Sequence, residues 1–363
     1  MSVHPAAFGH FAPIGTYLDT AAYGLPPRAA VAAMTEAIEQ WQTGSGRWQV
    51  DWDPAGEDCR TLLASIIGTS PGDVALEPAV SVGVGIAASL LAPGDEVVVP
   101  EDEFASLLLP LVAAAEARGA RVRRVPFGDL ADALGASTAL VATSHVRSNG
   151  GGLTGLDNLM AAADATATPV LLDATHSAGV LPIEMARRGI DLVVAAGYKH
   201  LLCPRGVGLL AISPRMQERI VPLCASWRAQ ADPYSDYFGG GLDKLAPDGS
   251  RFDVSLAWFS WVGARASLSL LDGVPAHERE RWCVGLADAL ADALQLRPTG
   301  SSILSVPVRG NRTTVAAALD AAKLRVSHGQ DAVRVSFHLY NGPNDVDRAA
   351  TVLASLRDPA RCE

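Results

Sequence analysis

From about residue 70 to residue 212, short runs rich in valine, leucine and isoleucine alternate with longer stretches rich in alanine and leucine. The short runs have the length of buried strands, whereas the longer stretches have the length of helices. This alternation is typical of an α/β domain in which helices cover both faces of a largely parallel sheet. The predicted strands are DVALEP (73–78), DEVVVP (95–100), ARVRRVPF (120–127), STALVATSHV (137–146), TPVLLDAT (168–175), DLVVAAG (191–197) and GVGLLAIS (206–213).

The hydrophobic pattern changes after a connector rich in glycine and aspartate at residues 237–253. Two long stretches of helical character follow within residues 256–294, and then two short strand-like runs at 303–308 and 332–339. Short strands that follow long helices, outside the alternating region, are typical of a separate α+β unit. We predict an N-terminal segment and a large α/β domain over residues 1–256, and a smaller α+β domain over residues 257–363.

The composition favours an enzyme-sized protein and argues against several classes of partner. Of the 363 residues, 49% are hydrophobic, which is enough for a sizeable core. Asp and Glu total 39 against 29 Lys and Arg, and this net charge of −10 disfavours nucleic acid and anionic lipid. The first residues lack a basic start and an apolar run, and no long apolar stretch occurs elsewhere. We expect a soluble cytoplasmic protein without nucleic-acid or membrane partners.

Cysteine usage agrees with that expectation. The count of cysteines is odd, and no two of them form a CxxC pair. Reduced thiols explain this pattern better than a disulfide framework or a zinc site, so we expect no metal. The five cysteines are Cys59, Cys203, Cys224, Cys283 and Cys362.

Lysine is rare in this chain, with only Lys199, Lys244 and Lys323 among the basic residues. An amine can lose its proton and act as a nucleophile, whereas a guanidinium effectively cannot. Lys199 follows a buried strand, where desolvation lowers the pKa of an ammonium as Schiff-base chemistry requires. A salt-bridged lysine is the alternative. The loop around Lys244 and the alanine-rich helix around Lys323 indicate solvated side chains.

Polar residues follow several of the predicted strands, where open α/β sheets collect their ligands. Asp173 ends one strand, and it either caps a helix or binds a cationic group. Residues 79–85 are small and precede a predicted helix, which suits a phosphate. Gly83 and Gly85 with Ala88 also satisfy G-x-G-x-x-A, and Glu101 closes the next strand, so a nicotinamide dinucleotide is an alternative ligand.

A phosphate cradle, an aspartate at one strand end and a lysine at the next together indicate a pyridoxal phosphate (PLP) site. The lysine binds the aldehyde, and the carboxylate pairs with the pyridine nitrogen so that the ring accepts electrons. Phe104 is positioned to stack on the ring, although core packing is the alternative. Three polar residues that could meet the ring hydroxyl or the substrate are His145, Ser148 and Asn149.

Nearly end to end, the chain resembles the class V aminotransferase family of fold-type I PLP enzymes. The segment DATHSAG, followed some 20 residues later by GYKH, is the most specific part of the resemblance. The other matching segments are YLDTAAYGLPP, EDEFASLLLP, VATSHVRSN, RFD at 251–253 and VRVSFHLYNGPNDVDR.

The resemblance implies a role for individual residues. Lys199 is expected to bind the cofactor covalently and to act in catalysis, and Arg334 is expected to bind the α-carboxylate of an amino-acid substrate. The family also implies a homodimer with sites near the subunit interface. The other implied cofactor contacts are Asp173 at the pyridine nitrogen, His176 near the ring hydroxyl, Phe104 on the ring, Val80, Ser81 and Tyr198 toward the phosphate, and Ser255 reaching across from the partner.

Departures from the family pattern narrow the expected activity. Val80-Ser81 stands where many members have two threonines, and Ala196 stands where serine is common. Cysteine desulfurases carry a nucleophilic cysteine shortly before the C-terminal arginine, whereas this chain has no cysteine between Cys283 and Cys362. A persulfide mechanism therefore lacks its nucleophile, which leaves β-elimination, transamination or epimerisation.

Within the family, the chain most resembles the carbon–sulfur lyases that cleave hercynylcysteine sulfoxide in ergothioneine biosynthesis. In that reaction the freed lysine removes the α-proton, the sulfur leaves as a sulfenate, and pyruvate and ammonia are released. Because the substrate carries a trimethylammonium group, we expect aromatic residues in its pocket. The candidates are Trp48 and Trp52 in the segment GSGRWQVDWDP, together with Tyr23, and Asn149 as a further substrate contact.

Other functions stay open at this stage. An isopenicillin-epimerase-like epimerase or an aminotransferase for another amino acid is the main alternative. A binding or scaffold protein without cofactor is disfavoured by the complete set of site residues, and a nicotinamide dehydrogenase rests on the glycine pattern alone.

Overall fold

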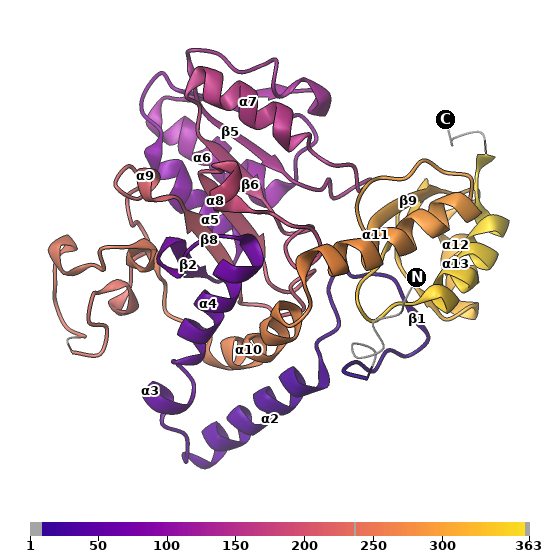
Figure 1. Cartoon of the computed structure of the whole chain (residues 1–363), viewed down its shortest axis with the longest axis horizontal. Helices are drawn as coiled ribbons and strands as arrows, with labels where there is room; N and C mark the ends of the chain where they lie inside the picture. The colour runs from indigo at the N-terminus through magenta and orange to yellow at the C-terminus, as the bar shows by residue number, and fades with distance from the viewer. Residues whose placement is uncertain (1–8, 236, 360–363) are drawn as a thin grey trace.

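A seven-stranded sheet forms the centre of the computed structural model, which describes residues 9–235 and 237–359; Cys362 lies outside them (Figure 1). The strand order is β2-β8-β7-β6-β5-β3-β4. Strands β4, β3, β5, β6 and β7 run parallel, whereas β8 is antiparallel to both of its neighbours. The predicted α/β class with a mainly parallel sheet is confirmed. The strands are β2 (Val74–Glu77), β3 (Glu96–Pro100), β4 (Arg121–Val125), β5 (Thr138–Ser144), β6 (Val170–Asp173), β7 (Leu192–Ala196) and β8 (Gly208–Ile212).

Both faces of this sheet are buried, because alternate side chains of a strand point to opposite faces. In β3, Val98 belongs to one hydrophobic cluster, whereas Val97 and Val99 belong to another. Helices α5 (Val80–Ala87) and α6 (Ala105–Arg118) contribute to the second cluster. The first cluster includes α4 (Ala55–Ile67) and α7 (Leu156–Thr166) and continues into the C-terminal elements.

Helix α5 begins earlier than the sequence pattern predicted. It starts at Val80, so Gly83 and Gly85 lie within the helix rather than in a loop before it. A Cβ at Gly83 would lie 3.2 Å from side-chain atoms of Leu210 and Val194. The glycine thus allows the helix to pack closely on the sheet, and the nicotinamide interpretation loses its glycine-rich turn.

The C-terminal elements surround a second, three-stranded antiparallel sheet with the order β11-β12-β9. Figure 1 shows α11 extending from near the end of α10 into the C-terminal elements, where it packs on α13 and β9. Helix α10 packs on α2 (Arg28–Thr43) and α4, so it contacts elements on the other side of the predicted domain boundary. The C-terminal elements are α10 (Trp258–Asp272), α11 (Ala276–Ala293), β9 (Ile303–Pro307), α12 (Arg312–Ala321), β10 (Leu324–Arg325), β11 (Ser327–His328), β12 (Ala332–Ser336) and α13 (Pro343–Leu356).

The N-terminal segment connects the two halves. Strand β1 (Thr16–Tyr17) pairs in parallel with β10, and the chain then passes beside the loop that carries Lys199. The Gly24 amide donates to the Tyr198 carbonyl at 2.8 Å, and a Cβ at Gly24 would lie only 2.2 Å from the Lys199 carbonyl oxygen. Only glycine permits this approach. The remaining short helices are α3 (Trp48–Asp51), α8 (Met185–Arg188) and α9 (Pro214–Gln217).

Within residues 9–235 and 237–359, no helix combines the length and the apolar character needed to cross a membrane. In the same residues, no cluster of three or more histidine, cysteine, aspartate or glutamate side chains has the arrangement of a metal site.

Candidate active site

Lys199 lies just beyond the end of β7 and is almost completely buried. Burial lowers the pKa of its amine to about 8, and the nearby Asp173 carboxylate partly offsets this shift. Its Nζ lies 3.2 Å from His176 Nε2 and 5.2 Å from the centre of the Phe104 ring. At pH 7 about a tenth of an amine with this pKa is neutral, against less than about a thousandth of an ordinary lysine, so the nucleophilic form is much more abundant here.

Asp173 ends β6, the strand beside β7, and its carboxylate accepts a hydrogen bond from the Thr175 amide at 2.8 Å. Burial raises the pKa of Asp173 to about 6, which leaves the group mainly ionised at pH 7. His176 follows three residues later. Burial, and to a smaller extent the charge of Lys199, lowers the pKa of this imidazole well below its usual range, so the ring is neutral. Asp173 and Lys199 occupy adjacent strand ends, as the sequence predicted.

A cavity of about 170 Å³ contains these groups. At one end lie Val80 and Ser81, in the first turn of α5, where amides without intrahelical acceptors favour an anion. Tyr198 and Arg205 line the same cavity, and the guanidinium lies 4.3 Å from the centre of the Tyr198 ring. Arg205 was not among the site residues predicted from the sequence, because nothing in the local pattern around it indicates a ligand contact.

A second cavity, of about 350 Å³, adjoins the first, and Phe104 lines both. Arg334 enters it from β12 of the small sheet, and Asn149 lines it as well. The Arg334 guanidinium donates to the Ser148 carbonyl at 2.7 Å, whereas its Nε is buried without a partner. Ser148 Oγ also lies 3.3 Å from His176 Nε2. The predicted substrate arginine is therefore one serine away from the histidine beside Lys199.

The structure does not bring Tyr23, Trp48 or Ser255 into either cavity. Trp48 stacks on Trp258 with ring centres 5.0 Å apart. It also contacts aromatic residues of the segment that projects from the large domain, residues 221–235 and 237–257 (Figure 1), namely Trp227, Tyr234 and Tyr237. Trp52 is buried against α10, the helix that begins with Trp258. Ser255 Oγ accepts a hydrogen bond from Trp227. Within one chain, the aromatic pocket expected around Trp48 and Trp52 is thus a packing cluster.

Tyr23 and His145 line other cavities. Tyr23 lines an apolar groove of about 580 Å³ on α2. This groove, called the α2 groove below, shares Tyr198 and Arg205 with the cavity that contains Lys199. His145 lines a cavity beside α7, and burial lowers its pKa to about 4. Of the three polar candidates after β5, only Ser148 and Asn149 face the Arg334 cavity.

No cysteine among the described residues lines the cavities that contain Lys199 and Arg334. Cys203 lines the α2 groove, where burial raises the pKa of its thiol well above the usual range. Cys59 and Cys283 are buried in the core.

This arrangement is typical of PLP-dependent enzymes with this type of sheet. It combines Lys199 and Asp173 at adjacent strand ends with the first turn of α5 and the nearby Arg334. The family model described as aminotransferase class-V matches residues 16–349. The chain belongs to this family, which is PLP-dependent.

Curated relatives differ in activity. A probable cysteine desulfurase of Aeropyrum pernix is 30% identical over 57% of this chain, and the isopenicillin N epimerase of Streptomyces clavuligerus is 30% identical over 53% of it. Each alignment spans 54% of the relative, so the chain matches about half the length of these two proteins. The cysteine desulfurase CsdA of Escherichia coli is 24% identical over 92% of both chains.

Solved structures establish the fold. A C-DES variant with glycine covalently linked to its PLP cofactor has a TM-score of 0.86 and 22% identity, and the match covers 97% of this chain and 99% of that chain. The cystine C–S lyase C-DES with its product cysteine persulfide has a TM-score of 0.84 and 23% identity, over 95% of this chain and 98% of that chain.

Proposed function

We propose that the protein is a PLP-dependent carbon–sulfur lyase that cleaves hercynylcysteine sulfoxide by β-elimination in ergothioneine biosynthesis. The observation that carries this proposal is a site with a buried lysine and an arginine for the substrate carboxylate but, among the described residues, without a thiol in either cavity. Such a site is suited to elimination and lacks the nucleophile for persulfide formation. The same fold serves a cystine C–S lyase.

The residues of the smaller cavity fit PLP. Three kinds of group line this one cavity. The Asp173 carboxylate suits the pyridine nitrogen, the Lys199 amine with its lowered pKa suits the aldehyde, and the Arg205 guanidinium near the first turn of α5 suits the phosphate. Asp173, Lys199, Arg205 and Ser81 would hold the cofactor at those three points. When bound, PLP supplies an electron sink for charge that develops at the substrate α-carbon.

The chain's own residues account for binding and proton transfer. Arg334 binds the substrate α-carboxylate through its guanidinium, a fork that fixes orientation. Lys199 Nζ then accepts the α-proton, because its lowered pKa leaves the amine available as a base near neutral pH. Neutral His176 contacts that amine at 3.2 Å without adding a second positive charge.

The bond between the β-carbon and sulfur breaks as the α-proton leaves. The electron pair departs with sulfur, which becomes a sulfenate, and water converts the three-carbon fragment into pyruvate and ammonia. The larger cavity beyond Phe104 has room for the departing group.

A homodimer and a cytoplasmic location belong to the same proposal. The α2 groove is apolar and open, and Val31 and Ile38 in its lining are 50% and 44% exposed. A second copy that covers this groove would shield these side chains. The free cysteines suit a reducing compartment.

The test is pyruvate production from hercynylcysteine sulfoxide by the holoenzyme, compared with Lys199→Ala. We expect pyruvate from the wild type and a loss of at least a thousandfold in the variant. An epimerase, as in the Streptomyces clavuligerus relative, would invert the α-carbon without releasing pyruvate. A PLP-loaded wild type that inverts its substrate or yields no pyruvate would refute the lyase proposal.

A further inference from the structure

Asp19 and Ser327 lie next to Arg334, the residue to which the proposed function assigns the substrate carboxylate. Ser327 of β11 is directly opposite Arg334 of β12 in the register of the small sheet. Asp19 follows β1 and forms a bridge with Ser336, two residues beyond Arg334 on β12. Because alternate residues of a strand point to the same face, the side chains of Asp19, Ser327 and Arg334 share one face.

A chain of hydrogen bonds connects these three side chains. Arg334 Nη2 donates to Ser327 Oγ at 3.2 Å, and the Ser327 hydroxyl donates to Asp19 Oδ1 at 2.5 Å. The direction of each bond is fixed, because a guanidinium only donates and an ionised carboxylate only accepts. The single hydroxyl proton of Ser327 is therefore directed at Asp19, and its lone pairs are left for Arg334.

We propose that Asp19 and Ser327 are positioning residues that fix the Arg334 guanidinium for a substrate α-carboxylate. This inference rests on the role of Arg334 in the proposed function, but not on the identity of the group that leaves with sulfur. The other terminal nitrogen, Nη1, donates to the Ser148 carbonyl at 2.7 Å. Held at both terminal nitrogens, the planar guanidinium is restrained from rotating, and its other N–H groups stay available at the cavity that it lines.

The charges of Asp19 and Arg334 support each other across Ser327. Burial raises the pKa of Asp19, which is 4% exposed, while the Ser327 hydrogen bond and the charge of Arg334 act in the opposite direction. Burial lowers the pKa of Arg334, and the charge of Asp19 opposes this. Among the described residues, no carboxylate forms a direct ion pair with Arg334, and its Nε is buried without a partner. A direct pair would occupy N–H groups that the substrate needs, whereas the intervening serine leaves them open.

Two amines that differ only in the carboxylate test the proposal on the PLP-loaded enzyme. L-Methionine carries the α-carboxylate, 3-(methylthio)propylamine lacks it, and neither has a leaving group on its β-carbon. The change in cofactor absorbance on binding gives a Kd for each without turnover. We expect the wild type to prefer L-methionine by about a hundredfold, because two N–H groups of one guanidinium can bind one carboxylate.

Three variants separate orientation from charge. Ser327→Ala removes the bridging hydroxyl and should reduce the preference to about tenfold, and Asp19→Ala should reduce it to a similar extent. Electrostatics alone predicts the opposite for Asp19→Ala, since removal of a nearby negative charge strengthens the attraction of an anion to Arg334. Asp19→Asn keeps an oxygen that accepts from Ser327, so its preference should stay within about threefold of the wild type.

Ser305 provides a matched control. It lies opposite Arg334 on β9, the strand on the other side of β12, and is half-buried like Ser327. Among the described residues, the Arg334 guanidinium donates to Ser148 and Ser327 but not to Ser305, so Ser305→Ala should leave the preference unchanged. With hercynylcysteine sulfoxide as substrate, Ser327→Ala should raise KM by about tenfold and change kcat by less than about twofold.

The outcomes separate this inference from the proposed function. A preference that survives in Ser327→Ala, or that falls equally in Ser305→Ala, would overturn the inference and leave the lyase intact. A preference that rises in Asp19→Ala would also overturn it, since Asp19 would then act through its charge alone. Should Asp19→Ala fail to fold, Ser327→Ala and its control decide the outcome.

Two further results concern both proposals. Equal binding of the two amines by the wild type would overturn the inference together with the role of Arg334. If hercynylcysteine sulfoxide yields no pyruvate, while the preference for L-methionine falls in Ser327→Ala but not in Ser305→Ala, the lyase proposal fails and the inference stands.

Discussion

The amine of Lys199 combines two opposing effects at a single residue. Burial lowers its pKa, and the Asp173 carboxylate raises it, with a resulting value of about 8. A free lysine has a pKa near 10.4, so at pH 8 it would be almost entirely protonated. Burial thus makes the amine reactive, and Asp173 limits how far the pKa falls.

This balance predicts the pH dependence of cofactor binding. The rate constant for binding of PLP to the apoenzyme should rise with pH up to about 8 and then become constant, because the neutral amine is the reacting form. Stopped-flow absorbance would measure it. Asp173→Asn should move the midpoint to lower pH, since the carboxylate stabilises the ammonium. A rate that continues to rise to pH 10 would contradict the buried environment of Lys199.

Glu77 is a buried acid that the proposed chemistry does not use. It ends β2 with no exposed surface, and both of its carboxylate oxygens lack hydrogen-bond partners among the described residues. Burial, and then repulsion by Asp253, raises its pKa well above the usual range. The folded protein therefore holds a proton that the unfolded chain releases at lower pH.

The sign of the resulting effect on stability follows from linkage. Because the folded pKa exceeds the unfolded one, the free energy of unfolding falls as pH rises above about 4.3, by up to about 1.4 kcal/mol per pH unit. Glu77→Gln should therefore be more stable than wild type at pH 8, and the difference should shrink toward pH 5. Urea denaturation at several pH values would measure this. If the free energy of unfolding changed with pH in the same way in both proteins, the result would contradict a raised pKa of Glu77.

At the scale of elements, the sequence predicted the strands and the residues at their ends. The reason is that strand runs and their polar ends are local patterns, and parallel packing brings those ends to one edge. Lys199 and Asp173 were therefore found without knowledge of any long-range contact. The start of α5 was misplaced, because Gly83 was taken as a loop former although it allows close packing on β7 and β8.

The placement of Trp48 shows why other features escaped prediction. Its stacking partner, Trp258, lies about 200 residues away, and no local pattern specifies that contact. The same holds for Arg205. It lies in a turn whose composition reveals no chemistry, and it becomes relevant only because that turn lines the cavity that contains Lys199.

Asp253 joins three elements through one buried carboxylate. It accepts a hydrogen bond from the Leu76 amide of β2 at 2.9 Å and forms an ion pair with Arg60 of α4 at 2.5 Å. It directly follows a short 3-10 turn, residues 249–252, that packs on β2. The side chains of Asp253 and Arg60 are both nearly inaccessible to solvent.

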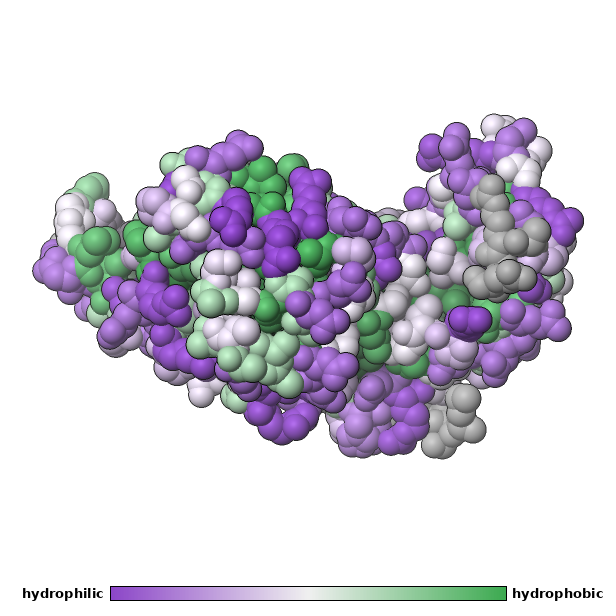
Figure 2. Space-filling view, turned by 90° about the horizontal axis from the view of Figure 1, so that it is seen from above, coloured by the Kyte–Doolittle hydropathy of each residue, from purple (hydrophilic) through white to green (hydrophobic). Residues whose placement is uncertain are grey.

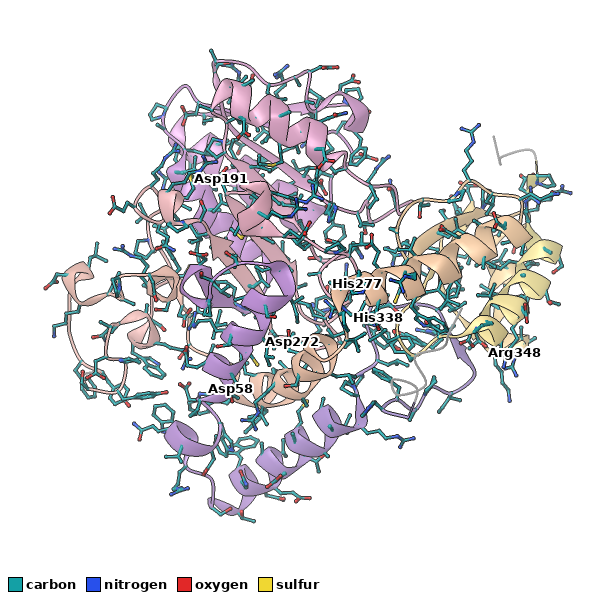
Figure 3. All side chains as sticks on the ribbon, viewed as in Figure 1. Asp58, Asp191, Asp272, His277, His338 and Arg348 are labelled. Atoms are coloured by element: carbon teal, nitrogen blue, oxygen red, sulfur yellow. The ribbon has the colours of Figure 1, made fainter. Side chains whose placement is uncertain are left out.

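Removal of this carboxylate should destabilise the fold strongly. Asp253→Ala leaves a buried guanidinium with reduced compensation, for which we expect a loss of about 3–5 kcal/mol in the free energy of unfolding. Asp58, labelled in Figure 3, offers a matched control, because it also pairs with an arginine but on the surface. Asp58→Ala should cost less than about 1 kcal/mol. Equal losses in denaturant titrations would show that burial does not decide the contribution.

At the scale of the whole molecule, apolar surface is concentrated in two places. One is the α2 groove, and the other is the projecting segment, residues 221–235 and 237–257, in which Leu223 and Leu242 are 58% and 68% exposed. Figure 2 shows hydrophobic surface at the end of the molecule that this segment forms. Large exposed apolar patches on a protein with an overall charge of −10 indicate contact surfaces.

The proposed homodimer can be tested at α2. Ile38→Glu places a charge in the groove and should convert the dimer into a monomer at micromolar concentration, because an unpaired carboxylate is costly to bury at an interface. Ala32→Glu introduces the same charge on an exposed part of α2 outside the groove and serves as the control. Sedimentation equilibrium would measure the mass of each. Since the groove shares Tyr198 and Arg205 with the Lys199 cavity, the Ile38→Glu monomer should also bind PLP more weakly. A variant that stays dimeric would place the interface elsewhere.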